Sequence, residues 1–307
     1  MTKSNDINLF NTIDLVWSKR VLILLVTGFF LVISILYALL APNLYTSSAL
    51  LKVSDGESNQ IDSLVSDYGG LASMAGISLP SSSDNKGPFI ISVIRSKEFL
   101  KHLLTFEKVK LNLMAVQNYN KDTKKIVYDN NKFDFKNKKW IRDFDDGRSQ
   151  NPSYVEVSEV YNESINVWQD DKTSFIYIDF THESPIFAND FLNLIIKEIN
   201  SQMRSQDLKE SEESLEYLYQ LLDKTSDNDL RDLVFNLIET QLKTQMLANI
   251  QEDYVFRKID SPFLPEKTSS PNRYLIILIG CFFGLLVSIL YILMNVVFTN
   301  RTSNQIS

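Results

Sequence analysis

Two long runs without a charged residue, one near each end of the chain, limit what this sequence can fold into. They are Val21–Leu40 and Tyr274–Phe298. A helix needs about 20 consecutive apolar residues to cross the hydrocarbon core of a bilayer, and each run is long enough. We therefore predict two transmembrane helices, at 21–40 and 274–298, on either side of a polar region at 41–273.

A cleaved secretory signal is the alternative interpretation of the first run. Such a signal has a shorter apolar core and ends in a cleavage site of small residues. Here Leu39 stands where a small residue is needed, and Pro42 directly after Ala41 would obstruct cleavage. We interpret the run as a retained anchor.

Basic residues beside the two runs predict the orientation of the chain. Lys19 and Arg20 precede the first run and Arg301 follows the second, whereas Arg273 lies at the opposite end of the second run. Lys and Arg are enriched on the cytoplasmic side of membrane spans. We expect cytoplasmic ends at 1–20 and 299–307, and a domain at 41–273 on the outer side, which is the periplasm in a Gram-negative cell.

The region 41–273 is acidic. Four of the 31 Lys and Arg residues and two of the 38 Asp and Glu residues lie outside it, which leaves 27 basic against 36 acidic side chains. Nucleic-acid binding is disfavoured, because neutralising phosphates requires clustered Lys and Arg. The one cysteine, Cys281, lies in the second apolar run, so we expect no disulfide in the outer domain.

Patterns in the region 41–273 predict a mixture of strands and helices. Apolar residues alternate with polar or small ones, as in half-buried strands, in Leu44–Val53 and Ser174–Phe180. Ile90–Leu103 has the apolar spacing of one amphipathic helix or two short ones, and Asn151–Ser153 is typical of a helix start. Strands and helices do not alternate regularly, so the expected fold class is α+β, without a Rossmann-like sheet.

The longest periodic segment runs from Pro185 to Phe256. Ser184 is typical of a helix cap and Pro185 of the first helical position. Thr225–Asp229 interrupts the period, and Ser226 is a candidate cap for a second helix. The segment is either one long helix or a hairpin, and its apolar stripes pack either on each other or between subunits. The residues we expect in an oligomer contact are Leu215, Leu218, Leu222, Leu230, Ile238 and Leu242.

No pattern in the sequence indicates catalysis, a cofactor or a metal site. The phosphate-binding pattern G-x-x-x-x-G-K-[ST] and the nucleophile pattern G-x-S-x-G are both absent. His102 and His182 are far apart in the sequence and their neighbours suggest no metal ligands, so we interpret both as surface or capping residues. We predict a non-enzymatic protein.

Small residues recur on one face of the second apolar run. Gly280, Gly284 and Ser288 follow each other at steps of four. Small residues let membrane helices approach closely, so we predict a helix-packing face. Ser34 and Ala38 form a lesser counterpart in the first run.

Three prolines lie directly before the second apolar run. Pro262 and Pro265 cannot continue a helix, so we expect them to end the long helix and to impose a stiff, extended connector over 261–273. Pro271 suits the first turn of the second membrane helix, where its missing N–H costs nothing.

Two further segments have an unusual composition. Asp55–Gly87 is rich in Gly and Ser, whose side chains are too small to form a deep core. We expect this segment to be partly mobile. Lys121–Asp146 is dense in Lys, Asp, Asn and aromatic residues. We expect short elements there, with Trp140 and Phe144 packed on the domain, and assign the segment no role.

Over nearly its whole length the chain resembles the Wzz-type chain length determinants, a family of polysaccharide co-polymerases. Pro42–Val53 (PNLYTSSALLKV) is similar to the family's first strand, with Pro42 and Tyr45 matching its Pro and Tyr, and Gly69–Leu79 (GGLASMAGISL) is similar to the stretch that follows. Asn151–Asn193 is similar to the central strand and the start of the long helix. Ser261–Gly284 is similar to the proline-rich segment and the Gly-containing second span.

The resemblance implies a membrane-proximal α/β base, a long helix rising from it, and bell-like homo-oligomers in the bacterial inner membrane. It also implies a function, which is to set the length of O-antigen or a related lipid-linked surface glycan together with a Wzy-type polymerase. Some relatives carry a cytoplasmic tyrosine kinase. Nine residues follow Phe298 and none is a tyrosine, so the chain resembles the kinase-free class.

Other function classes fit the sequence less well. A membrane subunit of a capsule or exopolysaccharide exporter would need a separate kinase. A two-span sensor would need a cytoplasmic output segment, which the short tail does not supply. A periplasmic efflux adaptor usually needs one anchor, and this chain has two apolar runs.

Overall fold

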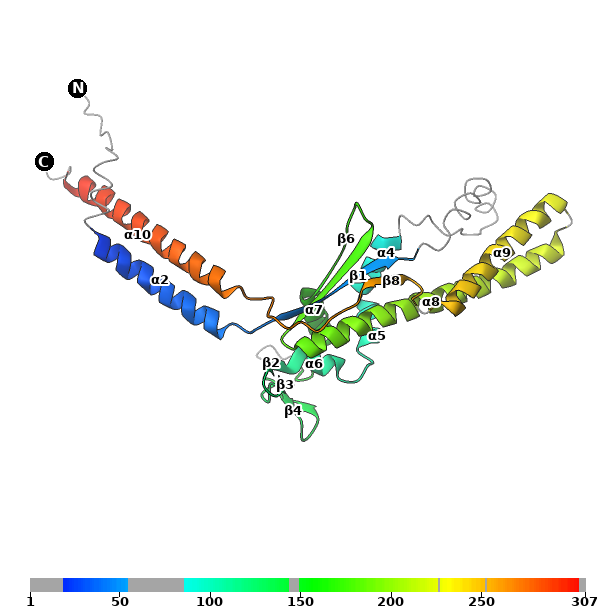
Figure 1. Cartoon of the computed structure of the whole chain (residues 1–307), viewed down its shortest axis with the longest axis horizontal. Helices are drawn as coiled ribbons and strands as arrows, with labels where there is room; N and C mark the ends of the chain where they lie inside the picture. Colours follow the sequence, from blue (N-terminus) through cyan, green and yellow to red (C-terminus); the bar gives the residue numbers. More distant parts are fainter. Residues whose placement is uncertain (1–18, 55–85, 144–148, 226, 252, 304–307) are drawn as a thin grey trace, which may run out of the picture. The chain divides into compact units, whose positions relative to one another are not determined.

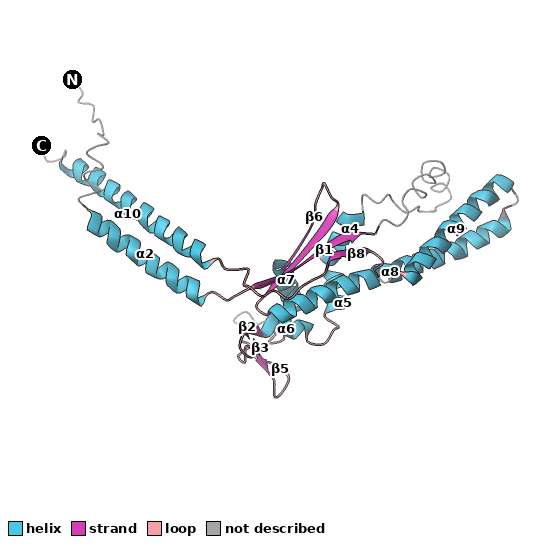
Figure 2. Ribbon diagram, viewed as in Figure 1, coloured by secondary structure: helices cyan, strands magenta, loops and turns pink. Residues whose placement is uncertain are grey.

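The computed structural model describes residues 19–54, 86–143, 149–225, 227–251 and 253–303. The chain divides into two compact units, which are treated separately. The helical unit is Met1–Asn43 with Thr268–Ser307, and the mixed unit is Leu44–Lys267. Figure 1 shows the elements in chain order, and Figure 2 shows their type.

The helical unit consists of α2 (Arg20–Leu40) and α10 (Arg273–Ser303), which pack side by side in antiparallel directions (Figure 1). Both are long and apolar enough to cross a membrane. Large apolar side chains on them stay exposed, among them Leu24 at 74% and Phe282 at 63%. Surfaces of this kind suit lipid better than water. The two apolar helices predicted at the ends of the chain are confirmed.

A four-stranded antiparallel sheet in the order β6-β7-β1-β8 forms the centre of the mixed unit. Its strands are β1 (Tyr45–Val53), β6 (Ile165–Gln169), β7 (Phe175–His182) and β8 (Phe256–Asp260). The register of β1 and β7 places Ala49 opposite Ile178. Every second residue of β7 is buried, as expected for a sheet with one covered face. The strands predicted at 44–53 and 174–180 are confirmed.

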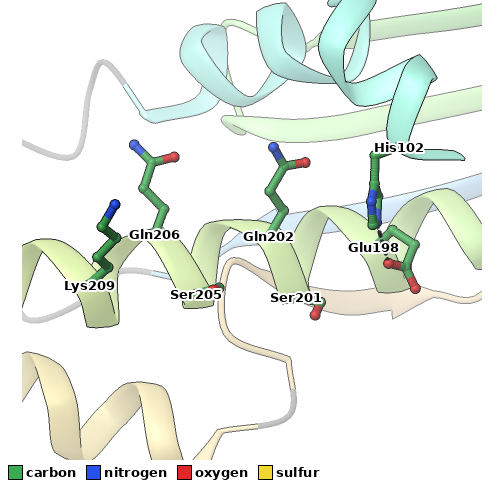
Figure 3. Close-up of a pocket in the computed structure, with 7 residues that line it drawn as sticks. All are labelled: His102, Glu198, Ser201, Gln202, Ser205, Gln206 and Lys209. Atoms are coloured by element: carbon green, nitrogen blue, oxygen red, sulfur yellow. Dashed lines mark hydrogen bonds and ion pairs between the residues drawn. The ribbon is translucent and has the colours of Figure 1, made fainter.

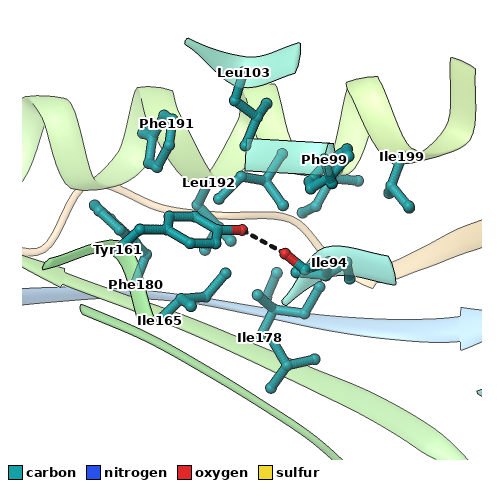
Figure 4. Close-up of a cluster of buried hydrophobic side chains, with 14 of the residues drawn as sticks. Ile94, Phe99, Leu103, Tyr161, Ile165, Ile178, Phe180, Phe191, Leu192 and Ile199 are labelled. Atoms are coloured by element: carbon teal, nitrogen blue, oxygen red, sulfur yellow. Dashed lines mark hydrogen bonds between the residues drawn. The ribbon is translucent and has the colours of Figure 1, made fainter. Parts of the chain in front are cut away.

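The core of the mixed unit lies between this sheet and α8 (Pro185–Lys224), as Figure 4 shows. Phe191, Leu192 and Ile195 of α8 are at most 1% exposed. Tyr161 reaches into the same cluster, and its hydroxyl donates a 2.9 Å hydrogen bond to the carbonyl oxygen of Ile94. This bond satisfies the one polar group that the buried ring brings into the core.

Four short helices complete the core. They are α4 (Lys86–Ile94), α5 (Lys97–Leu103), α6 (Val109–Ala115) and α7 (Tyr154–Ser164). The helical pattern at 90–103 is therefore two helices, separated at Ser96, which caps α5. Ser153 caps α7 through a reciprocal capping box with Glu156, so the predicted helix start is confirmed.

The long periodic segment is a helical hairpin. Ser184 caps α8 and Pro185 occupies its first turn, as predicted. The helix ends at Lys224, and α9 (Asn228–Ile250) packs back on it. Ser226, the candidate cap of the second helix, lies outside the described residues. Of the two alternatives for this segment, the hairpin is correct.

Two small hairpins form an outgrowth that we call the lysine lobe (Val116–Ile141). They are β2 (Val116–Asn120) with β3 (Lys125–Tyr128), and β4 (Phe133–Asp134) with β5 (Lys139–Trp140). They project beyond α6 in Figure 2. The expectation of short elements here is confirmed, and the Trp140 ring packs on Phe133. Phe144 and residues 55–85 lie outside the described part of the chain.

Candidate functional site

The small-residue face of α10 lies against α2 of the same chain. A Cβ atom added to Gly280 would lie 2.5 Å from Ser34 Oγ, so only glycine fits at this crossing. The Ser34 hydroxyl donates a 2.7 Å hydrogen bond to the carbonyl oxygen of Ile276. The structure therefore brings together Ser34 and Gly280, which the sequence had placed on separate runs.

One turn further along, the same crossing continues at Gly284. A Cβ atom on Gly284 would lie 2.9 Å from Phe30 Cβ and 2.9 Å from Thr27 Cα. Ser288 is fully buried and its hydroxyl donates to the carbonyl oxygen of Leu285. The helix-packing face predicted at Gly280, Gly284 and Ser288 is thus covered by α2 of the same chain.

The six apolar residues expected in an oligomer contact divide into two groups. Leu215, Leu218 and Ile238 are buried between α8 and α9, and Leu222 packs against the same cluster. These four serve the hairpin itself. Leu230 and Leu242 are each 47% exposed, so they remain available to another molecule.

The proline segment differs from its prediction at both ends. The element before Pro262 is the strand β8, and α9 already ends at Ile250, so the prolines do not terminate the long helix. The reason is strand pairing, since Phe256 joins the edge of β1 opposite Val53. Pro271 also lies outside the first turn of α10, because the helix begins at Arg273 and Asn272 accepts the backbone N–H of Leu275.

Pro265 is buried and Pro262 is half-buried, on a stretch with neither helix nor strand. The hydroxyl of Ser47, in β1, donates a 3.0 Å hydrogen bond to the carbonyl oxygen of Phe263. Tyr45, at the start of β1, is 2% exposed and packs edge-to-face with Tyr119 of the lysine lobe. Pro42 precedes β1 and follows α2 directly after Ala41.

A polar groove of about 460 Å³ runs along α8 (Figure 3). Its lining comes from α5 and from successive turns of α8, and consists of His102, Glu198, Ser201, Gln202, Ser205, Gln206 and Lys209. His102 Nε2 lies 2.8 Å from Glu198 Oε2 at one end. The side chains of Gln202 and Gln206 point to the same side of the helix in Figure 3.

Gln202 contributes an unsatisfied acceptor to this groove. Its Oε1 atom is shielded from solvent and has no hydrogen-bond partner among the described residues. A polar atom of this kind favours a ligand that donates hydrogen bonds. The groove therefore offers hydrogen-bond donors and acceptors at spacings of one helical turn. This arrangement suits a ligand rich in hydroxyl groups and not an apolar ligand.

The two histidines have different environments. His102 lies at the groove, as a surface residue. His182 is 3% exposed; its Nδ1 accepts the backbone N–H of Ser184, so its Nε2 carries the proton that is donated to the Asn112 carbonyl oxygen. Burial lowers the pKa of His182. Among the described residues, no three His, Cys, Asp or Glu side chains are grouped as metal ligands.

Asn200 is a structural residue that the sequence did not reveal. It is buried in α8, and its Oδ1 accepts the backbone N–H groups of Val255 and Phe256 at 2.8 and 3.0 Å. Its position among the apolar residues Ile196 and Ile199 was the available signal, because a buried amide in such a stripe needs partners.

Comparisons with known proteins find a family similarity for one part of the chain. Residues 5–105 match the family model described as Wzz, chain length determinant protein. Among curated proteins no significant match is found. A solved full-length bacterial polysaccharide co-polymerase is similar over 96% of this chain and 98% of its own, with 12% identity and a TM-score of 0.39. A fragment of WzzB, the polysaccharide co-polymerase from Salmonella Typhimurium, is similar over 74% of this chain and all of its own, with 16% identity and a TM-score of 0.27.

Both TM-scores are below 0.5, so the family model alone carries the assignment. The matched residues include α2 and β1, and within them the PNLYTSSALLKV stretch that suggested the resemblance. Residues 5–105 of this chain are therefore similar to the Wzz-type chain length determinants.

Proposed function

We propose that this protein sets the length of a bacterial surface polysaccharide and does so without catalysing a reaction. The match of residues 5–105 to the chain length determinant family carries the proposal. We infer that the glycan is O-antigen or a related lipid-linked polymer, and that the polymerase is of the Wzy type.

The proposed location is the bacterial inner membrane, with α2 and α10 as two spans. Lys19, Arg20 and Arg301 support cytoplasmic ends, because basic residues are enriched on that side. The mixed unit then faces the periplasm. Its place in the chain, between the two apolar helices, supports this arrangement.

We further propose a homo-oligomer in which another copy covers α9. Phe235, Leu242, Met246 and Ile250 recur on one face of this helix and are 47 to 72% exposed. An apolar stripe of this size on a water-facing unit is typical of an interaction surface.

The polar groove on α8 is our candidate for contact with the glycan. Sugar hydroxyls both donate and accept hydrogen bonds. The amides of Gln202 and Gln206, the hydroxyls of Ser201 and Ser205, and the shielded Gln202 Oε1 atom offer complementary groups.

Gene deletion followed by separation of surface polysaccharides by size tests the proposal. Loss of the modal length, with polymer still made, would support it, and restoration of the length by the wild-type gene is the matching control. Loss of all polymer would favour a subunit of a polysaccharide exporter. An unchanged length distribution would contradict both.

A further inference from the structure

The lysine lobe has a charge opposite to that of the domain that carries it. Val116–Ile141 contains seven lysines and three aspartates, with no Arg or Glu, whereas region 41–273 as a whole has an excess of acidic residues. All seven lysine side chains are exposed. The members of this set are Lys121, Lys124, Lys125, Lys132, Lys136, Lys138 and Lys139.

Two of the three acidic groups of the lobe are used in its own turns. Asp129 Oδ1 accepts the backbone N–H of Asn131 at 2.9 Å. The two carboxylate oxygens of Asp134 accept the backbone N–H of Lys136 and the side-chain amide of Asn137, at 2.8 and 2.7 Å. Among the described residues, no carboxylate forms an ion pair with any of the seven lysines. Their charges are therefore available to a partner outside the chain.

Two of these lysines occupy a backbone conformation that other residues adopt more easily. Lys124 and Lys138, in the turns of the β2–β3 and β4–β5 hairpins, have φ angles of 50° and 51°. Glycine or asparagine would be less strained in this left-handed region. Asparagine can therefore replace either lysine without added strain in its turn.

Aromatic and apolar side chains accompany the lysines. The Phe133 ring contacts the rings of Phe135 and Trp140, with centroids 5.0 and 5.1 Å apart. Phe135 is 43% exposed and Ile141 is 41% exposed. A shallow depression of about 530 Å³ lies between β3 and Phe135, with Lys125 in its lining. Basic residues combined with exposed aromatic ones are typical of surfaces that bind the interface of a membrane.

Chain length keeps the lobe near a bilayer if α2 crosses it. Tyr45 packs on Tyr119 of the lobe, and the Lys121 ammonium lies 5.7 Å from the centre of the Tyr45 ring. Four residues, 41–44, separate Tyr45 from the end of α2. An extended chain covers at most about 3.6 Å per residue, so Tyr45 stays within about 18 Å of the point where α2 ends.

We propose that the lysine lobe binds the anionic headgroup layer of the membrane that α2 crosses. The lysines face lipid phosphates, and Phe135 and Ile141 enter the interface between headgroups and acyl chains. The proposal depends on α2 as a membrane span. It is independent of the glycan function, so either can fail without the other.

The test uses the full chain reconstituted in phosphatidylcholine vesicles with and without phosphatidylglycerol. A fluorescent label is attached at Ile141→Cys in a Cys281→Ser background, and doxyl-labelled phosphatidylcholine serves as the quencher. We expect quenching to increase with phosphatidylglycerol and to weaken with added salt. The matched label position is Asn249→Cys, an exposed residue of α9 outside the proposed oligomer contact, where we expect little quenching.

The charge test is the double variant Lys124→Asn with Lys138→Asn. Asparagine tolerates the left-handed conformation, so both turns are kept while two charges are removed. We expect the ratio of bound to unbound lobe to fall about 25-fold, at about fivefold for each lysine. Lys197→Asn with Lys224→Asn, both exposed on α8, is the control and should leave quenching unchanged.

Three results would overturn the proposal. They are quenching at Ile141→Cys that is independent of phosphatidylglycerol, equal quenching at Asn249→Cys, and equal effects of the two double variants. A label that responds to soluble alginate and not to phosphatidylglycerol would show that the lobe binds an acidic glycan instead.

Discussion

Gly280 and Ser34 are in direct contact across α10 and α2, at a distance that leaves no room for a side chain on Gly280. The Ser34 hydroxyl bonds to the backbone one turn before this glycine, so the two helices share both close packing and a hydrogen bond. The consequences of this pairing can be measured.

Gly280→Leu is expected to destabilise the helical unit by about 1–3 kcal/mol, because overpacking forces the helices apart. Gly28→Leu is the control, since nothing lies within 4 Å of a Cβ atom at Gly28. Thermal unfolding of the protein in detergent measures both. Equal unfolding temperatures for the two variants would contradict the packing described here.

In cells, Gly284→Leu is expected to shift or broaden the glycan length distribution while the protein still inserts.

Leu218→Ala and Leu242→Ala should separate folding from assembly. Leu218 is 1% exposed inside the hairpin, so its truncation is expected to cost about 2–5 kcal/mol in the free energy of unfolding. Leu242 is 47% exposed, so its truncation should change monomer stability little and weaken oligomers. Denaturant unfolding and light scattering report the two effects. A stable, fully assembled Leu242→Ala protein would exclude this face from the oligomer contact.

Asn200→Leu should detach β8 from α8. The change leaves the N–H groups of Val255 and Phe256 without their acceptor, at a cost of about 1–3 kcal/mol for each buried group. Asn193→Leu, at an exposed position of the same helix, should have little effect. Amide hydrogen exchange at residues 255 and 256 should accelerate only in the first variant. Unchanged protection there would refute the role of Asn200.

The burial of His182 predicts a stability that depends on pH. Its pKa in the folded state lies below the ordinary value of 6.5, so at mildly acidic pH the unfolded chain binds more protons than the folded one. The stabilisation is present above pH 6.5 and is lost as the pH falls from 6.5 towards the folded pKa. Denaturant midpoints at several pH values measure this loss. In His182→Asn the loss of stability between pH 6.5 and the folded-state pKa of His182 should diminish. An unaltered pH profile would show that His182 is not the group responsible for it.

The groove on α8 can be tested by the glycan it is proposed to contact. Gln202→Leu with Gln206→Leu removes two amides from the lining and is expected to change the modal length of the polysaccharide. Gln220→Leu, an exposed glutamine of the same helix outside the groove, should leave it unchanged. Gel profiles of the surface polysaccharide provide the comparison. Identical profiles for all three proteins would remove the groove as a glycan contact.

Local signals allowed a good part of the fold to be predicted. The two apolar helices follow from length and composition, and the starts of α7 and α8 follow from Ser153, Ser184 and Pro185, because capping depends on neighbours in the chain. The break near Thr225 was also visible, although the sequence left open whether the second helix folds back. That choice depends on contacts between Leu218 and residues such as Val234, which periodicity alone does not reveal.

Long-range contacts explain what the sequence missed. Residues 251–256 continue a helical pattern, yet Phe256 joins the sheet because β1 has a free edge there and Asn200 binds the incoming backbone. The partner of Gly280 was likewise not deducible, since a small-residue stripe fits another subunit as well as α2. The groove lining comes from α5 and α8, whose side chains meet only after the core has formed.

The pairing of β1 with β8 has one more consequence. The chain enters the mixed unit through β1 and leaves it after β8, its neighbour in the sheet, and Ser47 bonds to Phe263 just inside the two exits. The two ends of this unit are therefore joined a few residues inside Leu44 and Lys267. A protein made of residues 44–267 would have adjacent termini, suited to joining by a short linker into a cyclic chain or to insertion into a loop of a carrier protein.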